Sequence, residues 1–191
     1  MAGPAREYVF GYGSLAAWAG RAPAVAELLG ARRVWGVAMD NREAIPGYKV
    51  FLDPADDTRP AVHVAFLDLA GAADDAPALN GVLVAAEPGG LAAFDARERN
   101  YERAEVTDRV PGAPGRVWAY SGSAAGRARL AAGLRAGTAV VSRAYLDGVE
   151  EAFARLGDGE LERFRATTQP PPVPVQELRR VDLPPRAPAR R

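Results

Sequence analysis

The chain has 191 residues, 48% of them hydrophobic and 25% charged, which is enough for one globular domain with its own core. Its 24 basic and 24 acidic residues cancel, so no overall field favours nucleic acid or an anionic membrane, and a small-molecule partner is expected instead. With no cysteine and His63 as its one histidine, the composition excludes thiol catalysis, disulfides and zinc-finger sites, and a serine–histidine relay lacks its parts.

The N-terminal residues 1–10 show neither the charged segment nor the long apolar segment of a signal peptide. No window of the sequence approaches the ~20 apolar residues of a membrane span. We therefore expect a cytoplasmic protein. Neither a heptad pattern nor an apolar surface stripe indicates an oligomer, so a monomer is the default expectation and a homodimer stays open.

The first predicted element is a short buried strand at residues 8–10. The glycine loop GYGSLA follows it, and then a brief helix at residues 23–29 that Gly30 ends. β-Branched and aromatic residues between clusters of proline, glycine and aspartate predict four strands, at residues 31–40, 48–52, 61–69 and 79–86. His63 alternates with valines in the third of these strands, which predicts a side chain facing solvent or a polar partner, without a catalytic role.

A helix is predicted at residues 89–101, where Leu91, Phe94 and Glu98 have the spacing of one helix face. Arg97 and Arg99 are expected to point elsewhere. A glutamate that faces the interior has a raised pKa, which suits a general acid and base. The alternative is that Glu98 lies at the rim of the helix end and pairs with a nearby arginine.

Two further strands are predicted at residues 101–110 and 115–122. Ser142 has the features of an N-cap for a helix that Gly157 ends. The apolar stripe of that helix consists of Tyr145, Val149, Phe153 and Leu156. Asp158 is then expected to cap a shorter helix that runs to about residue 164.

The predicted strands outnumber the helices without a regular βα alternation, which favours an α+β domain with a mixed, strongly curved sheet. We assign this single domain to residues 1–166. Residues 167–191 are rich in proline and arginine, so we expect an extended or mobile tail that does not pack as regular structure.

Three functions of the glycine loop compete. Gly11, Gly13 and Ala16 fit the dinucleotide-binding pattern, although arginines occupy the region where an acidic residue is expected to bind the ribose. A phosphate-binding P-loop is excluded because no Gly-Lys pair follows. Backbone N–H groups converging on a carboxylate or an oxyanion are the third function. The structural alternative is a tight turn in which Gly11 and Gly13 only supply positive φ.

Two short blocks of the sequence together resemble the γ-glutamylcyclotransferase superfamily, with its AIG2-like and ChaC-like branches. The loop of that family reads Y-G-S-[LN], and it is matched here by Tyr12, Gly13, Ser14 and Leu15. The later block is matched by Asp95, Glu98, Tyr101, Arg103 and Val106. The resemblance covers residues 8–122.

The resemblance implies a small mixed β-barrel with flanking helices and an enzyme that needs neither metal nor cofactor. Its reaction would convert a γ-glutamyl amide into 5-oxoproline and a free amine. Glu98 would carry the proton, and the loop would hold the α-carboxylate or the oxyanion through the N–H groups of Gly13, Ser14 and Leu15. Tyr12 would line the pocket or donate a hydrogen bond, and Tyr101 would support it.

The remaining residues and functions stay as alternatives. Tyr120 is expected in the core, and Asp95 either orients Glu98 or caps local backbone. The substrate stays open among glutathione, γ-glutamyl amino acids, γ-glutamyl amines and biosynthetic intermediates, with the loops at residues 41–48 and 70–77 as candidate selectors. A non-catalytic module that binds a small ligand on the same fold is a second function, and nucleotide binding through Gly11 and Gly13 is a third.

Overall fold

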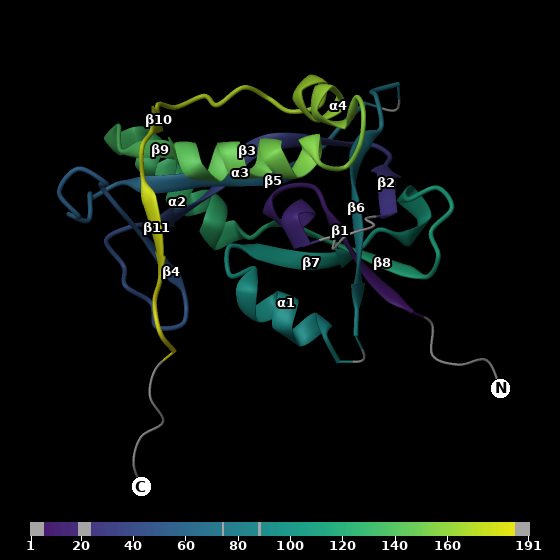
Figure 1. Ribbon diagram of the computed structural model, residues 1–191, viewed down its shortest axis with the longest axis horizontal. Helices are drawn as coiled ribbons and strands as arrows, with labels where there is room; N and C mark the ends of the chain where they lie inside the picture. Colours follow the sequence, from purple (N-terminus) through teal and green to yellow (C-terminus); the bar gives the residue numbers. More distant parts are fainter. Residues whose placement is uncertain (1–5, 19–23, 74, 88, 186–191) are drawn as a thin grey trace, which may run out of the picture.

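The computed structural model describes residues 6–18, 24–73, 75–87 and 89–185. Figure 1 shows strands that cross near the middle of the molecule, with α3 and α4 above them and α1 below β7. In chain order the elements are β1 (Glu7–Gly11), η1 (Ser14–Trp18), β2 (Ala24–Leu28), β3 (Ala31–Asp40), β4 (Lys49–Leu52), β5 (His63–Gly71), β6 (Leu79–Ala86), α1 (Leu91–Arg97), β7 (Tyr101–Glu105), η2 (Thr107–Arg109), β8 (Arg116–Gly122), α2 (Ala124–Ala136), β9 (Ala139–Ser142), α3 (Arg143–Ala154), α4 (Glu160–Ala166), β10 (Val175–Gln176) and β11 (Arg179–Asp182).

The strands form three sheets, with the orders β2-β6-β1-β8-β7, β10-β9-β5-β3 and β11-β4. β1 is parallel to β8, and β9 is parallel to both β5 and β10, whereas the other pairs are antiparallel. The predicted α+β class with mixed strand directions is therefore confirmed. The sheet orders of the described residues contain no closed ring of strands, so the barrel implied by the resemblance does not appear as such.

The first two sheets meet where β5 contacts β8. Residues 63–68 of β5 are all buried, because this strand lies between β9 and β3 and has a second sheet against one face. The Asp68 carboxylate ties the sheets together, since its Oδ1 accepts a hydrogen bond of 2.5 Å from the Gly122 N–H of β8. Arg127 of α2 donates to the other oxygen of Asp68 at 3.1 Å.

Gly122 is the position at which this contact tolerates no side chain. A Cβ atom there would lie 2.4 Å from both Asp68 Oδ2 and Val37 Cγ1. We therefore expect Gly122→Ala to lower the free energy of unfolding by about 1–3 kcal/mol, the usual effect of overpacking. Urea unfolding measures this change. Gly71→Ala is the matched control, because a Cβ atom at Gly71 meets nothing within 4 Å; equal unfolding midpoints for the two variants would contradict the prediction.

The segment predicted as a helix at residues 23–29 was assigned wrongly. Residue 23 lies outside the described residues, and β2 (Ala24–Leu28) is a strand that pairs antiparallel with β6 from Ala24↔Leu83 to Leu28↔Leu79. Alanine, glutamate and leucine favour a helix locally, but pairing with a neighbouring strand overrides this weak preference.

Helix α2 and strand β9 were not predicted from the sequence. The buried side of α2 is made of Gly126, Leu130 and Gly133, so the helix has no stripe of large apolar residues to reveal it. Its ends do carry signals, because Ser123 accepts a hydrogen bond from the Gly126 N–H and Gly137 adopts a left-handed conformation.

The C-terminal elements differ in two ways from the prediction. Ser142 caps α3 as expected, but α4 begins after Gly159 without a side-chain cap, so the proposed role of Asp158 was wrong. Residues 167–185 are largely extended, yet they include β10, paired with β9, and β11, paired with β4. The prediction that this segment does not pack as regular structure was therefore wrong for these two strands.

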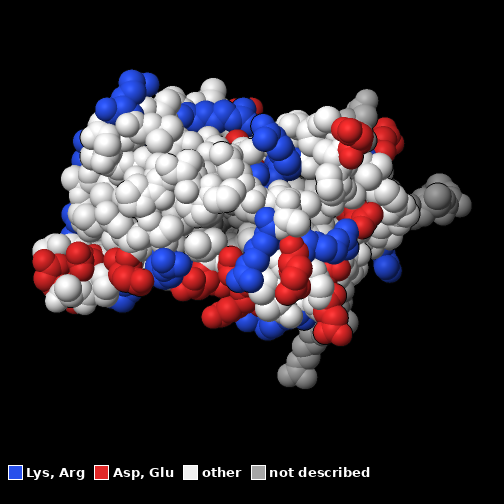
Figure 2. Space-filling view, turned by 90° about the horizontal axis from the view of Figure 1, so that it is seen from above, with Lys and Arg blue, Asp and Glu red and all other residues white. Residues whose placement is uncertain are grey.

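None of the helices in the described ranges combines the length and the apolar composition that a membrane-spanning helix requires. Figure 2 shows basic and acidic side chains lying next to one another over part of the face seen from above. Around α4 they form ion pairs, since Arg163 contacts Glu27 and Glu160, and Arg165 contacts Glu150. This local pairing agrees with the balanced composition.

Candidate active site

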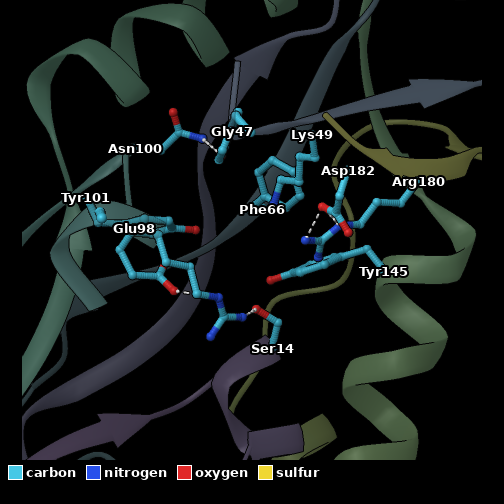
Figure 3. Close-up of a pocket in the computed structure, with 13 residues that line it drawn as sticks. Ser14, Gly47, Lys49, Phe66, Glu98, Asn100, Tyr101, Tyr145, Arg180 and Asp182 are labelled. Carbon is cyan, nitrogen blue, oxygen red and sulfur yellow. Dashed lines mark hydrogen bonds and ion pairs between the residues drawn. The ribbon is translucent and has the colours of Figure 1, made fainter. Parts of the chain in front are cut away.

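A cavity of about 280 Å³ lies between the end of α1 and the ribbon formed by β4 and β11. Glu98 and Tyr101 lie on one side of it, and Lys49, Arg180 and Asp182 lie on the opposite side (Figure 3). Ser14 and Tyr145 lie between the two walls. The cavity therefore places the predicted carboxylate opposite charged residues that come from distant parts of the chain.

Glu98 reaches the cavity because α1 ends one residue before it. Its backbone leaves the helix with φ −89° and ψ 50°. The N–H of Glu98 bonds to the Phe94 carbonyl, and its own carbonyl accepts from the Tyr101 N–H, both at 2.9 Å. Leu91 and Phe94 anchor the helix by packing on the small cluster around Val9. The turn, and not the helix face proposed from the spacing, therefore directs the side chain, which is 14% exposed.

The carboxylate of Glu98 is both buried and close to a cation. Burial raises its pKa, and the positive charges of Arg97, Lys49 and Arg180 oppose part of that rise. Arg97 Nε lies 3.6 Å from Glu98 Oε1, and Arg97 Nη2 donates to Ser14 Oγ at 3.3 Å. The expectation that Arg97 points elsewhere was wrong. A carboxylate whose pKa is raised by burial gives up and takes back a proton more readily during catalysis than an exposed glutamate does.

Removing the Arg97 charge should raise the pKa of Glu98 further. The guanidinium is the nearest cation to the carboxylate, and it favours the ionised form. An NMR titration of isotope-labelled glutamate should therefore show a higher midpoint for Glu98 in Arg97→Met than in the unmodified protein. Arg99→Met is the control, because Arg99 lies outside the lining of this cavity. An unchanged or lower midpoint in Arg97→Met would contradict the assignment.

The glycine loop lies beside Glu98. Together with Glu98 and Tyr101, it lines a niche of about 30 Å³ next to the main cavity; the loop residues are Tyr12, Gly13, Ser14 and Leu15. The N–H groups of Gly13, Ser14 and Leu15 have no hydrogen-bond partner among the described residues. The structure thus brings all of the candidate site residues together and leaves donors free at the niche.

The two glycines of the loop are not there to supply a positive φ, which was the structural alternative. Neither Gly11 nor Gly13 has positive φ. A Cβ atom at Gly11 would lie 3.0 Å from Leu15 Cβ, so this glycine permits the loop to fold closely back on β1. At Gly13 the nearest atom to a Cβ would be the Tyr145 hydroxyl at 3.5 Å, which leaves the backbone next to a polar group.

Buried tyrosines surround the niche. The Tyr12 hydroxyl donates to the Tyr120 carbonyl at 2.6 Å, and the Tyr101 hydroxyl donates to the Leu67 carbonyl at 2.7 Å. The Tyr145 hydroxyl accepts from the Leu67 N–H at 3.4 Å. Burial raises the pKa of Tyr12, Tyr101 and Tyr145, so these hydroxyls stay neutral. Tyr145 was assigned only to an apolar helix stripe, and its polar end was missed.

Of three further residues weighed from the sequence, Tyr120 lines the niche, whereas Asp95 and His63 lie outside it. Tyr120 is buried as expected, and its hydroxyl donates to Asp95 Oδ1 at 2.7 Å. Asp95 Oδ2 also lies 3.5 Å from Arg103 Nη2, and within the described residues its carboxylate bonds neither to Glu98 nor to a backbone N–H, so both roles expected for Asp95 were wrong. His63 is 5% exposed, and its Nδ1 lies 2.9 Å from Thr138 Oγ1, which is the polar partner expected and not solvent.

The wall opposite Glu98 was missed by the sequence analysis. In the β4–β11 ribbon Asp182 pairs with Lys49 and Arg180 pairs with Phe51, which puts all four side chains on one face. Arg180 donates to Asp182 Oδ1 at 2.9 Å and 2.6 Å. Burial and the nearby Arg180 lower the pKa of Lys49 to about 8. The sequence does distinguish one residue of this wall, because Lys49 is the single lysine among 24 basic residues.

Among the described residues, no group of three or more histidine, aspartate or glutamate side chains is arranged to hold a metal ion. The dinucleotide interpretation of the glycine loop requires a strand, a crossover helix and a parallel strand in succession. Here β1 is followed by η1 and by β2, and both β1 and β2 pair antiparallel with β6. The loop therefore lacks the surroundings that this function needs.

Comparisons with known proteins bear on the fold. No family model matches the sequence, and no curated protein matches it. A solved structure described as a gamma-glutamyl cyclotransferase has a TM-score of 0.50 and 13% identity, and the match covers 87% of this chain and 90% of that chain. The resemblance inferred from the two sequence blocks is thus confirmed at the level of the fold.

Proposed function

We propose that the protein is a cofactor-independent enzyme of the γ-glutamylcyclotransferase type, which converts a γ-glutamyl amide into 5-oxoproline and a free amine. One observation carries the proposal. The buried Glu98 carboxylate and the free N–H groups of Gly13, Ser14 and Leu15 line the same niche. The likeness in fold to a gamma-glutamyl cyclotransferase supports it.

The reaction needs a group that transfers protons and hydrogen-bond donors that stabilise the oxyanion. Glu98 accepts a proton from the substrate's α-ammonium group, and the resulting amine attacks the γ-carbonyl carbon. A ring C–N bond forms, and the carbonyl oxygen becomes an oxyanion. When the carbonyl re-forms, the bond to the leaving nitrogen breaks. Glu98 passes two protons in turn from the attacking to the leaving nitrogen, so the ring keeps one N–H and the amine leaves as ammonium.

The protein mainly has to position the substrate's α-amine against its γ-carbonyl and to stabilise the charges that develop, because nucleophile and electrophile belong to one substrate molecule. The free N–H groups of the loop would bind the α-carboxylate or the oxyanion without any side-chain charge. Tyr12, Tyr101 and Tyr145 would close the niche against water and fix its shape through their hydrogen bonds. A buried carboxylate of raised pKa beside free backbone donors is typical of acid–base catalysis, which favours an enzyme over a module that only binds ligand.

The test is release of 5-oxoproline, measured by mass spectrometry. The substrate panel contains glutathione, several γ-glutamyl amino acids and several γ-glutamyl amines. Release from one class of substrate supports the proposed function and identifies the leaving amine. A folded protein that releases 5-oxoproline from none of them contradicts it.

A further inference from the structure

The cavity beside the niche carries unbalanced positive charge. Two carboxylates, Glu98 and Asp182, face three cations, Arg97, Lys49 and Arg180. Arg97 lies next to Glu98, and Arg180 is bonded to Asp182. Lys49 is the cation that remains, since it forms no hydrogen bond or ion pair with a carboxylate among the described residues.

Within the part of the chain that the structure describes, Lys49 is held in place by aromatic rings and not by a counter-ion. Its Nζ lies 4.3 Å from the centroid of the Phe66 ring and 5.3 Å from that of Tyr48. Ring contacts of this kind offset only part of the penalty for burying an ammonium group, and the lowered pKa of Lys49 reflects that penalty. A ligand carboxylate in the cavity would complete the missing ion pair.

The position of the main cavity relative to the niche indicates which part of a substrate would reach Lys49. On the proposed function, the glutamyl end occupies the niche at Glu98 and the loop. The leaving amine must then extend into the main cavity toward the β4–β11 ribbon (Figure 3). From there a second compartment of about 240 Å³ continues past Lys49 and Tyr145 toward Phe51, Trp18 and Val149. Its apolar residues suit the side chain of an amino acid.

We infer that Lys49 binds a carboxylate carried by the leaving amine, so that the substrate is a γ-glutamyl amino acid or γ-glutamyl peptide and not a γ-glutamyl alkylamine. This inference rests on the proposed function for the assignment of the leaving side. At neutral pH such a substrate carries two carboxylates and one ammonium, and its net charge of about −1 complements the one excess cation of the cavity.

The test compares two substrates that differ by one carboxylate, γ-glutamylalanine and γ-glutamylethylamine. The unmodified protein should have the higher kcat/KM for γ-glutamylalanine. In Lys49→Met the ratio of the two kcat/KM values should fall by about 10- to 100-fold, the usual effect of losing a hydrogen bond between charged groups. Lys49→Arg keeps the charge and should retain most of the ratio. Arg99→Met removes a cation outside the cavity lining and should leave the ratio unchanged. An unchanged ratio in Lys49→Met overturns the inference.

Binding measurements separate this inference from the proposed function. Glu98→Gln blocks turnover, so calorimetric titration of this variant with each of the two compounds reports affinity alone. We expect tighter binding of γ-glutamylalanine, and a loss of that preference when Lys49→Met is added. If the unmodified protein releases no 5-oxoproline but this preference is present, the proposed function fails and the carboxylate site stands. If Glu98→Gln binds both compounds equally, the carboxylate site fails whatever the turnover.

Discussion

Glu98→Gln should lower kcat for 5-oxoproline release by about 10²- to 10⁴-fold while the protein stays folded, the range expected for loss of general acid–base catalysis. The amide matches the carboxylate in size but cannot accept the proton of the α-ammonium. The side chain is 14% exposed and faces the cavity, so the substitution disturbs little packing. Glu102→Gln is the control, because Glu102 is exposed on β7, and its activity should stay within about twofold.

The same variant has an expected effect on stability. Burial raises the pKa of Glu98 in the folded protein, so the folded state binds more protons than the unfolded state above the unfolded pKa of about 4.3. Ionised Glu98 therefore lowers stability at neutral pH, and glutamine removes that effect. The melting temperature of Glu98→Gln relative to the unmodified protein should rise as the pH is raised from acid to neutral.

A folded Glu98→Gln protein that keeps full activity would disprove the mechanism.

The parts of the site that could be predicted are those that depend on short stretches of chain. The glycine loop follows a strand whose apolar residues reveal it, and Glu98 follows a short helix with apolar anchors at Leu91 and Phe94. The motif spacing brought Tyr101 into the same prediction. Each of these residues lies within a few positions of a local signal, and the structure places all of them at one niche.

The opposite wall could not be predicted because it depends on pairing between distant segments. Lys49 and Asp182 become neighbours only through the antiparallel register of β4 and β11. Nothing in the proline-rich sequence around β11 shows which strand it joins, since pairing partners are not encoded in local periodicity. The strand β2 illustrates the same limit, because its partner β6 decides its conformation.

The largest loss of stability is expected for Arg33→Met. Arg33 is 1% exposed, and its guanidinium donates to backbone and side-chain oxygens from three parts of the chain. Its Nε bonds to the Tyr12 carbonyl at 2.6 Å, its Nη1 bonds to Thr167 Oγ1 at 2.8 Å, and its Nη2 bonds to the Asn80 carbonyl. The Phe153 and Phe164 rings lie side by side against it, with centroids 4.6 Å from one another and each 4.7 Å from Cζ.

Methionine can fill part of this volume but donates no hydrogen bond. The carbonyls of Tyr12 and Asn80 would stay buried without Arg33, at about 1–3 kcal/mol for each acceptor left unpaired. We therefore expect the free energy of unfolding to fall by about 3–5 kcal/mol, within the range measured for broken buried networks. Lysine cannot restore the lost stability, because one ammonium group cannot reach all of the oxygens to which the planar guanidinium donates.

Arg33→Met should also disturb the site, because one of its hydrogen bonds holds the carbonyl that precedes Gly13. Amide NMR signals of Gly13, Ser14 and Leu15 should shift or broaden in any Arg33→Met protein that folds. Arg32→Met is the matched control, since Arg32 is the next residue of β3 and is exposed. Urea unfolding should separate the two variants widely. If Arg33→Met unfolds at the same urea concentration as Arg32→Met, this guanidinium does not join the loop to the core.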